Sequence, residues 1–218
     1  MHTGIFHTFF LRISRTFLTF LLLLHFFALP IGKVDAQADY LQEAIRNSFL
    51  ELNQVRQNPA LYATKYKLSA LKRIPKIHAL TWDTTLARLA QQKAADMANR
   101  NYFSHQDKQG RGMNYYVRRA NYPLPAIFSK KISDNGVESI AANTEGPDEF
   151  IRQLIIDEGV RNLGHRKHLM GLDHFKENTH VGIGIAYNPK SKYKYYCSIL
   201  LAPKDNPRVN SSPKTSSR

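Results

Sequence analysis

The apolar residues in the first part of the chain recur at helical spacing. Residues 40–57 carry five large apolar side chains at intervals of four, four, three and three, which places them on one helical face: Leu41, Ile45, Phe49, Leu52 and Val55. We predict that this helix ends before Pro59, because the residue that precedes a proline avoids helical geometry.

A second helix is predicted within residues 80–101. Asp83 or Thr84 can cap its first turn, and its apolar stripe consists of Leu86, Ala90, Ala94 and Met97. Residues 101–135 show no sustained period, so we expect a long loop with one short helix near residues 113–120. Gly146-Pro147 then predicts the start of a third helix, and "HRKHLMG" at residues 165–171 a further short one.

The pattern changes to a period of two near the end of the chain. Large apolar residues alternate with glycine and alanine in "VGIGIAY", a turn follows, and "YKYYCSILLA" returns the chain as an antiparallel hairpin. The small residues on one face of the first strand indicate that another element packs closely there. Helices come first and strands late, without strand–helix alternation, which favours an α+β domain with helices on a small antiparallel sheet.

The first 36 residues have the features of a secretory signal peptide. Arg12 and Arg15 precede an apolar run, and Val34 and Ala36 stand at positions −3 and −1 of an expected cleavage site. The alternative is an uncleaved membrane anchor, but the run is shorter than the ~20 residues that a span needs. We therefore expect a secreted or periplasmic (cell-envelope) protein, whose only membrane contact is through the signal peptide before cleavage.

The sequence thus divides into three parts. We predict a signal peptide at residues 1–36, one folded domain at residues 37–202, and a disordered tail at residues 203–218, where the chain is polar and rich in proline and serine. The whole chain has 31 basic and 17 acidic residues, a net charge of +14. The signal peptide holds three of those bases and one acid, which leaves +12.

The distribution of charge and the single cysteine limit the kinds of partner and the sources of stability that this protein can have. The basic residues are spread along the chain, so they predict a solvated surface that is compatible with anionic ligands, and an exported protein has little cause to meet nucleic acid. One cysteine, Cys197, cannot form an internal disulfide, so stability must come from the core. Cys197 lies on the expected inward face of the second hairpin strand and is interpreted as a buried apolar residue.

Three segments combine a histidine or an acid with a neighbouring glycine in sequence that otherwise looks like loop. They contain His105, Glu138 and His165. Two imidazoles and a carboxylate suit a divalent metal such as zinc, with a position left open for water or a ligand. The same groups could act as general acid and base without a metal, or each could be structural.

The order of these segments resembles the CAP superfamily, the secreted domain shared by cysteine-rich secretory proteins, insect venom antigen 5 and plant pathogenesis-related proteins. The resemblance covers roughly residues 41–202 and rests on six segments in order: "LELNQVRQNP", "LTWDTTLARLAQQKAADMA", "FSHQDKQG", "GVESIA", "GHRKHLM" and "VGIGIAY…YYCSILLA". Ser139 and His168 stand where the family usually has asparagine. The family's disulfides are absent, as in its bacterial type.

The resemblance implies a three-layer α-β-α sandwich, with a small central antiparallel sheet flanked by helices. It also implies a cleft lined by two histidines and one or two acids, which in some members holds a divalent cation. His105, Glu138 and His165 match this set, with the two histidines as metal ligands and Glu138 as a further one. For the second acid we expect Glu158, with Asp157 as the next choice, whereas Arg166 and Lys167 are expected to be solvated.

Three functions are compatible with these features. We favour a non-catalytic extracellular binding module, a monomer that requires no cofactor but can hold zinc, and whose partner is a lipid, a glycan or a protein. The first alternative is a metal-dependent hydrolase, a protease or esterase, that uses the same cleft. Ser104 and Ser139 adjoin the site residues, so a hydrolase could also use one of these serines as a nucleophile activated by a histidine. The second alternative is a structural or interaction protein of the envelope.

Overall fold

The computed structural model describes residues 31–204. The apolar run of the expected signal peptide lies outside the described residues, and so does the tail from residue 205. The expected cleavage site after Ala36 falls within the first described helix, α2 (Ile31–Gln57). Residues up to Asp39 and those from Tyr40 onward form two separate units. Within residues 31–204, no helix combines the length and the apolar character needed to cross a bilayer.

In the first half of the chain, the end of α2 and the starts of the next two α-helices lie where the sequence signals stand, whereas α2 already includes Ile31, before the predicted range of 40–57. α2 ends at Gln57, and α3 (Pro59–Lys65) starts at once with a proline in its first turn. A 3₁₀ turn, η2 (Ser69–Arg73), follows. α4 (Thr84–Asn99) is capped by Asp83, whose Oδ1 accepts hydrogen bonds from the backbone N–H groups of Thr85 and Leu86 at 2.9 and 3.0 Å. Both long predicted helices are confirmed.

The later helices are short. α5 (Met113–Arg119), α6 (Phe150–Ile156) and α7 (Gly164–Leu169) each make about two turns, and η3 (Asp173–Phe175) is a single 3₁₀ turn. α5 and α7 lie where the sequence predicted short helices. α6 begins three residues after Pro147, so the proline belongs to the turn before the helix and not to its first turn.

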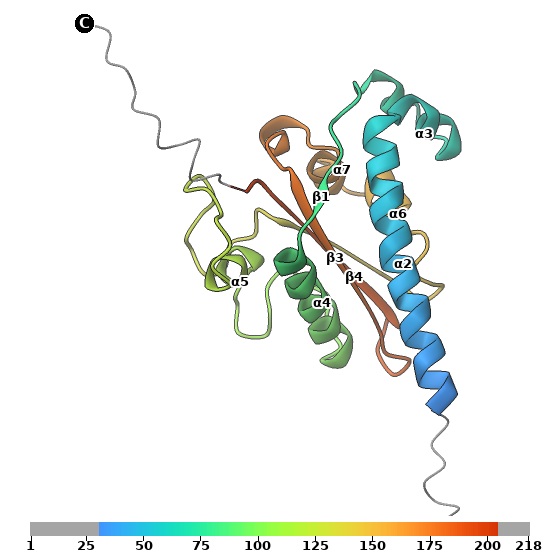
Figure 1. Ribbon diagram of the computed structural model, residues 1–218, viewed down its shortest axis with the longest axis vertical. Helices are drawn as coiled ribbons and strands as arrows, with labels where there is room; N and C mark the ends of the chain where they lie inside the picture. Colours follow the sequence, from blue (N-terminus) through green and yellow to red (C-terminus); the bar gives the residue numbers. More distant parts are fainter. Residues whose placement is uncertain (1–30, 205–218) are drawn as a thin grey trace, which may run out of the picture. The chain divides into compact units, whose positions relative to one another are not determined.

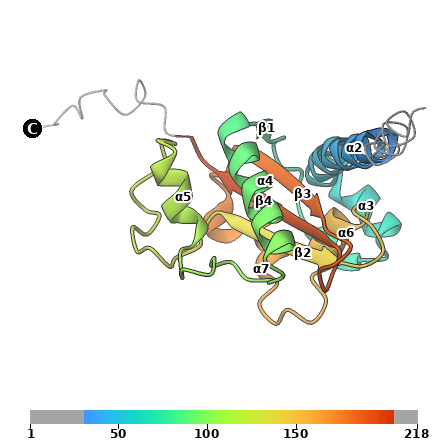
Figure 2. The same ribbon diagram turned by 90° about the horizontal axis from the view of Figure 1, so that it is seen from below.

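Four strands form one sheet in the order β1-β3-β4-β2, which can be followed in Figure 2. They are β1 (Thr81–Trp82), β2 (Glu138–Asn143), β3 (His180–Tyr187) and β4 (Tyr195–Ala202). The predicted β3–β4 hairpin is confirmed, with Ile183 opposite Ile199. β2 and β4 are also antiparallel, whereas the short edge strand β1 pairs with β3 in parallel. The expected antiparallel sheet therefore has one parallel pair at its edge.

α4 covers one face of the sheet at very short range. A Cβ atom on Gly182 would lie 2.0 Å from the backbone nitrogen of Ala87, and one on Gly184 would lie 2.2 Å from that of Gln91. The amide of Gln91 also bonds both backbone polar groups of Ile185 at 3.0 Å, where β3 extends beyond its short partner β1. The small residues of β3 are therefore what allows this helix to lie against the strand, as predicted.

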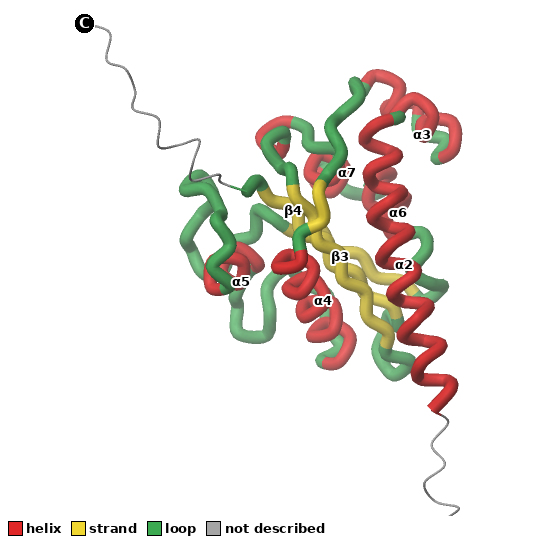
Figure 3. The backbone as a smooth tube through the Cα atoms, in the orientation of Figure 1, coloured by secondary structure: helices red, strands yellow, loops and turns green. Residues whose placement is uncertain are grey.

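The opposite face of the sheet carries the larger core. Apolar side chains of α2, α6 and α7 pack there on one face of the hairpin, which includes Ile183, Ile199 and the buried Cys197. Figures 1 and 3 show α2 and α4 on opposite sides of the strands, and the predicted three-layer α-β-α sandwich is confirmed. The fully buried Arg56 connects α2 with two other segments, because its guanidinium donates to the carbonyls of His78 (3.0 Å) and of Leu169 in α7 (2.7 Å).

Candidate functional site

A histidine and a buried carboxylate meet at the start of β2. His105 lies on the loop after α4, and its Nδ1 is 3.0 Å from Oε2 of Glu138, the first residue of the strand. The Glu138 side chain has no exposed surface, and its other oxygen accepts a hydrogen bond from the Ser198 hydroxyl at 2.8 Å. Both oxygens of this carboxylate are therefore engaged within the protein.

Asn135 orients this first pair. Its Oδ1 accepts from the Glu138 backbone N–H, its Nδ2 donates to the Glu138 carbonyl, both at 3.1 Å, and Nδ2 lies 3.0 Å from His105 Nδ1. Asn135 is not among the site residues expected from the sequence. The signal that could have found it is the turn motif "SDNG", in which an asparagine precedes a glycine three residues before Glu138.

A second pair of the same kind lies on α7. His165 is in the first turn of that helix, and its Nδ1 is 2.8 Å from Oδ1 of Asp157, whose side chain is 1% exposed. The other oxygen of Asp157 accepts from the Arg166 backbone N–H at 3.2 Å. Each histidine thus has a buried carboxylate at its Nδ1 atom.

The expectation for Glu158 is corrected by this geometry, because the acid at His165 is Asp157. Asp157 ends α6 in the left-handed conformation (φ 55°), and this reversal turns its carboxylate back toward α7. Glu158 is the next residue along the chain and is exposed. Sequence spacing could not separate the two acids, since the choice depends on one backbone angle.

Arg166 also differs from expectation. It is buried (8% exposed) and its Nε donates to the Ile155 carbonyl at 2.7 Å, so it satisfies a free carbonyl at the end of α6. Lys167 is half-buried and lies 3.0 Å from Asp173. The basic run after His165 therefore contributes to the local fold and is not a fully solvated face.

The two histidine–carboxylate pairs lie next to each other. The ring centroids of His105 and His165 are 6.4 Å apart, and their planes are inclined by 34°. Their side chains are 40% and 26% exposed, in contrast with the buried carboxylates behind them. Among the described residues, neither Nε2 atom takes part in a hydrogen bond. The site therefore presents two fixed imidazoles whose second nitrogens remain available.

These residues fit a metal that is bound through imidazole alone. In residues 31–204 no three His, Cys, Asp or Glu side chains are grouped so that they could hold one ion. The carboxylates instead occupy the Nδ1 side, as outer partners of metal-binding histidines do, where they fix the tautomer and the ring orientation. His105 and His165 could thus supply two nitrogen ligands, with the remaining positions left to solvent or a ligand.

Ser139 and His168, the two departures from the family pattern, contact each other. The Ser139 hydroxyl lies 2.8 Å from His168 Nδ1, and both side chains are buried on the sheet face opposite to Glu138. Burial lowers the pKa of His168 to about 3, so the ring is neutral. Since Ser139 is 1% exposed, it is not accessible as a nucleophile. Within residues 31–204, the Ser104 hydroxyl makes one side-chain hydrogen bond, which it accepts from the Gln106 backbone N–H at 3.2 Å.

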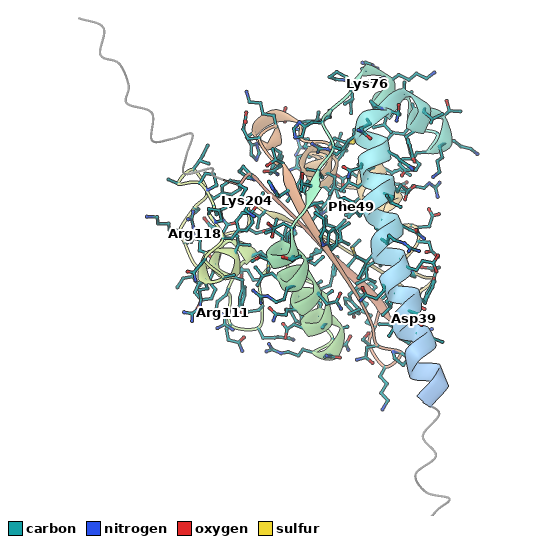
Figure 4. The ribbon with its side chains drawn as sticks, viewed as in Figure 1. Asp39, Phe49, Lys76, Arg111, Arg118 and Lys204 are labelled. Carbon is teal, nitrogen blue, oxygen red and sulfur yellow. The ribbon has the colours of Figure 1, made fainter. Side chains whose placement is uncertain are left out.

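A cavity of about 710 Å³ adjoins the site. Asn135 forms part of its wall, together with apolar residues of the loop after α5, among them Pro125, Ile127 and Phe128. This loop is held by Arg118, which donates to the Leu124 and Pro125 carbonyls at 3.2 Å. Lys204 also lines the cavity. Figure 4 shows Arg118 and Lys204 on the same side of the molecule. The volume lies in the range of sites for small organic ligands.

The fold and the site define a small α-β-α domain with paired histidines, and the comparisons identify its family. The model of the cysteine-rich secretory protein family (CAP) matches residues 51–200. The chain belongs to this family, and the expected relationship is confirmed. None of the curated proteins matches the sequence.

Two solved structures are similar to the chain. One is an extracellular protein with an SCP domain from Bacillus anthracis, at 18% identity and a TM-score of 0.46; the alignment covers 75% of this chain and 43% of that protein. The other is an outer surface protein of Borrelia burgdorferi, at 13% identity and a TM-score of 0.49, with 75% of this chain and 94% of that protein covered. The chain thus spans less than half the length of the Bacillus protein.

Proposed function

We propose that this CAP protein is an exported, non-catalytic binding module whose ligand occupies the cavity beside the two histidines. The observation that carries the proposal is the position of Asn135, which donates to the Glu138 carbonyl, lies 3.0 Å from His105 Nδ1, and also lines the cavity of about 710 Å³. A ligand in that cavity could therefore contact Asn135, the residue that holds the start of β2 beside His105. Export is supported by the signal-peptide features of residues 1–36.

The cavity walls indicate an amphipathic ligand. Pro125, Ile127 and Phe128 offer apolar surface, while amide and hydroxyl groups line the rest, from residues such as Asn114 and Ser129. Lys204 at the same cavity is paired with Asp83 at 3.0 Å, and Asp134 and Glu177 add two carboxylates to the wall. A lipid, a glycan or a peptide with both apolar and polar parts would satisfy these walls.

We further propose that His105 and His165 bind zinc weakly. When bound, the metal would supply a Lewis-acid centre that could polarise an oxygen atom of a ligand. Glu138 and Asp157 would keep the proton on each Nδ1 atom and leave Nε2 free to bind. Because only two protein ligands are involved, we expect weaker binding than at structural zinc sites with four.

Hydrolysis is the second candidate, and the contacts of Glu138 weigh against it. A general base needs a lone pair directed at the attacking water. In Glu138 both oxygens are instead engaged by the protein. Oε1 accepts from the Ser198 hydroxyl at 2.8 Å, and Oε2 lies 3.0 Å from His105 Nδ1. The Ser139–His168 pair, which has the composition of a nucleophile and its base, is buried away from substrate.

Isothermal titration calorimetry with zinc tests the metal part of the proposal. We expect the His105→Ala/His165→Ala double variant to lose most of the zinc affinity, because both proposed ligands are removed. The exposed His174 serves as a matched control, so His174→Ala should keep the affinity of the unmodified protein. Equal zinc affinity in the double variant, with its circular dichroism spectrum unchanged, would contradict the proposal.

The non-catalytic assignment has its own test. Peptide, ester and glycan substrates are offered to the protein and to Glu138→Gln, a variant of the same shape without the charge. We expect no turnover that depends on Glu138. Activity that disappears in Glu138→Gln, while the thermal melting curve shows a folded protein, would make hydrolysis the function.

A further inference from the structure

We propose that a second cavity, between α4 and α5, binds the carboxylate of a small organic acid through the ammonium group of Lys93. This cavity has a volume of about 250 Å³. Its walls come from α4, the loop that follows it, and α5: Leu89, Gln92, Lys93, Asp96, Arg100, Asp107, Gln109, Arg111, Met113 and Tyr116. None of these residues belongs to the histidine site, so the proposal is independent of the function proposed above.

The two acids of the cavity are already neutralised. Burial would raise the pKa of Asp107, but hydrogen bonds from the Tyr116 hydroxyl and from the backbone N–H (3.0 Å) and Nε (2.8 Å) of Arg111 hold it far below the ordinary value. Asp96 pairs with Arg100 at 3.3 Å and accepts from the Tyr102 hydroxyl. Figure 4 shows Arg111 near α4 and α5. Each acid thus has its own arginine.

Lys93 is the cation that remains. It is 5% exposed, and its Nζ makes one hydrogen bond, to the Tyr102 hydroxyl at 3.3 Å. Within residues 31–204, no carboxylate lies within 4.0 Å of it. An ammonium group has three donors, so two of them have no partner there. Burial lowers the pKa of Lys93, although three surrounding carboxylates act in the opposite direction. A buried cation without a paired anion is costly, and a bound anion would remove that cost.

The walls favour an organic acid over a bare inorganic ion. One free ammonium group matches the single charge of a carboxylate, whereas a phosphate dianion would need a second free cation. Leu89 and Met113 are buried and form an apolar part of the wall, while Gln92 and Gln109 are exposed and can bond hydroxyl groups. The cavity is therefore suited to a carboxylate on a short, hydroxylated carbon chain or ring. Such a group occurs in free hydroxy acids and in uronic acids of glycans.

The alternative is that Lys93 only compensates the buried charge of Glu138, which is among the carboxylates that raise its pKa. In that case the cavity would have no affinity for added acids. The two accounts differ in one measurable quantity, the saturable binding of a carboxylate at Lys93.

Nuclear magnetic resonance titration of the full chain tests this. The probes are sodium lactate for a free hydroxy acid and sodium glucuronate for a uronic acid, with glucose as the uncharged comparison and sodium chloride holding the ionic strength constant. We expect at least one acid, but not glucose, to bind with a dissociation constant on the order of 1 mM, as one charged contact in a small site allows. The probe that binds identifies the source of the carboxylate.

Two variants locate the site. Lys93→Met should weaken binding about tenfold or more, because a charge-assisted hydrogen bond is lost. Lys108→Met is the matched control. Lys108 is exposed, and its Nζ lies over the ring of Tyr102, the residue that Lys93 also contacts, at 5.3 Å from the ring centroid. It should keep the original affinity. If Lys93→Met does not fold, the ¹³Cε resonance of Lys93 in the unmodified protein replaces it and should shift saturably with the acid. No saturable shift, or equal binding by Lys93→Met, would overturn the proposal.

Discussion

Individual side chains in this protein are often paired across long stretches of sequence. Ser139 and His168 stand 29 positions apart and share one buried hydrogen bond of 2.8 Å. Taken singly, each is a departure from the asparagine that the family usually has. This contact satisfies one ring nitrogen of His168, and a buried nitrogen without a partner would cost about 1–3 kcal/mol. The two residues therefore form one structural unit in the core.

His168 should make the stability of the protein dependent on pH. Burial lowers its pKa from 6.5 to about 3, so below pH 6.5 the unfolded chain binds a proton that the folded protein does not. The free energy of unfolding should therefore fall as the pH decreases from 6.5 toward 3. His168→Asn should lose this part of the slope, and the exposed control His174→Asn should keep it. Urea denaturation at a series of pH values measures the effect; equal slopes in all three proteins would refute it.

At the scale of elements, contacts between helix and strand decide where the site forms. β2 lies at the edge of the sheet, with Glu138 on the face that α4 covers and Ser139 on the face of α7. His105 comes from the loop after α4 and His165 from α7 itself, so the two layers of helices meet at this edge. The site depends on α4 and α7 holding their positions against the strands.

Gly184 is one of two glycines, with Gly182, at which the α4–β3 contact should not tolerate a side chain. A methyl group there would lie 2.2 Å from the backbone nitrogen of Gln91, so Gly184→Ala must push the helix away. We expect a loss of about 1–3 kcal/mol in the free energy of unfolding, as for other overpacked cores. Gly136→Ala is the control: its nearest neighbour is a ring carbon of Phe128 at 3.3 Å, which can move. Urea denaturation that found both variants equally stable would contradict this packing.

At the scale of the whole molecule, stability rests on burial without covalent cross-links. The described residues contain one cysteine, Cys197, which is fully buried in the centre of the sheet. Burial raises the pKa of its thiol far above the ordinary value, so the reactive thiolate is absent from the folded state. Cys197 therefore reports on the opening of the core as a whole.

Thiol labelling should accordingly follow global unfolding. In excess maleimide, Cys197 should react at the rate at which the protein unfolds, and that rate should equal the one seen by circular dichroism in the same buffer. A small local opening would instead expose the thiol more often than the fold is lost. Labelling much faster than unfolding would show that the hairpin opens by itself.

Sequence pattern alone was enough for the elements with a strong period. The helices α2 and α4 follow from apolar spacing, the β3–β4 hairpin from alternation, and the Asp83 cap from its position before the stripe. β2 could not be found in this way, because its first four residues are buried on both faces and show no alternation. β1 is only two residues long, too short for any period.

The sequence by itself determined the fold class, the family, and three residues that the structure brings together: His105, Glu138 and His165. Tertiary structure decided which groups hold them, through contacts that local spacing does not encode. The left-handed turn at residue 157 selected Asp157 over Glu158, and the turn before β2 brought in Asn135. Packing between α4 and α5 left Lys93 buried without a carboxylate partner among the described residues. These outcomes depend on how distant segments meet, and only the folded chain contains that information.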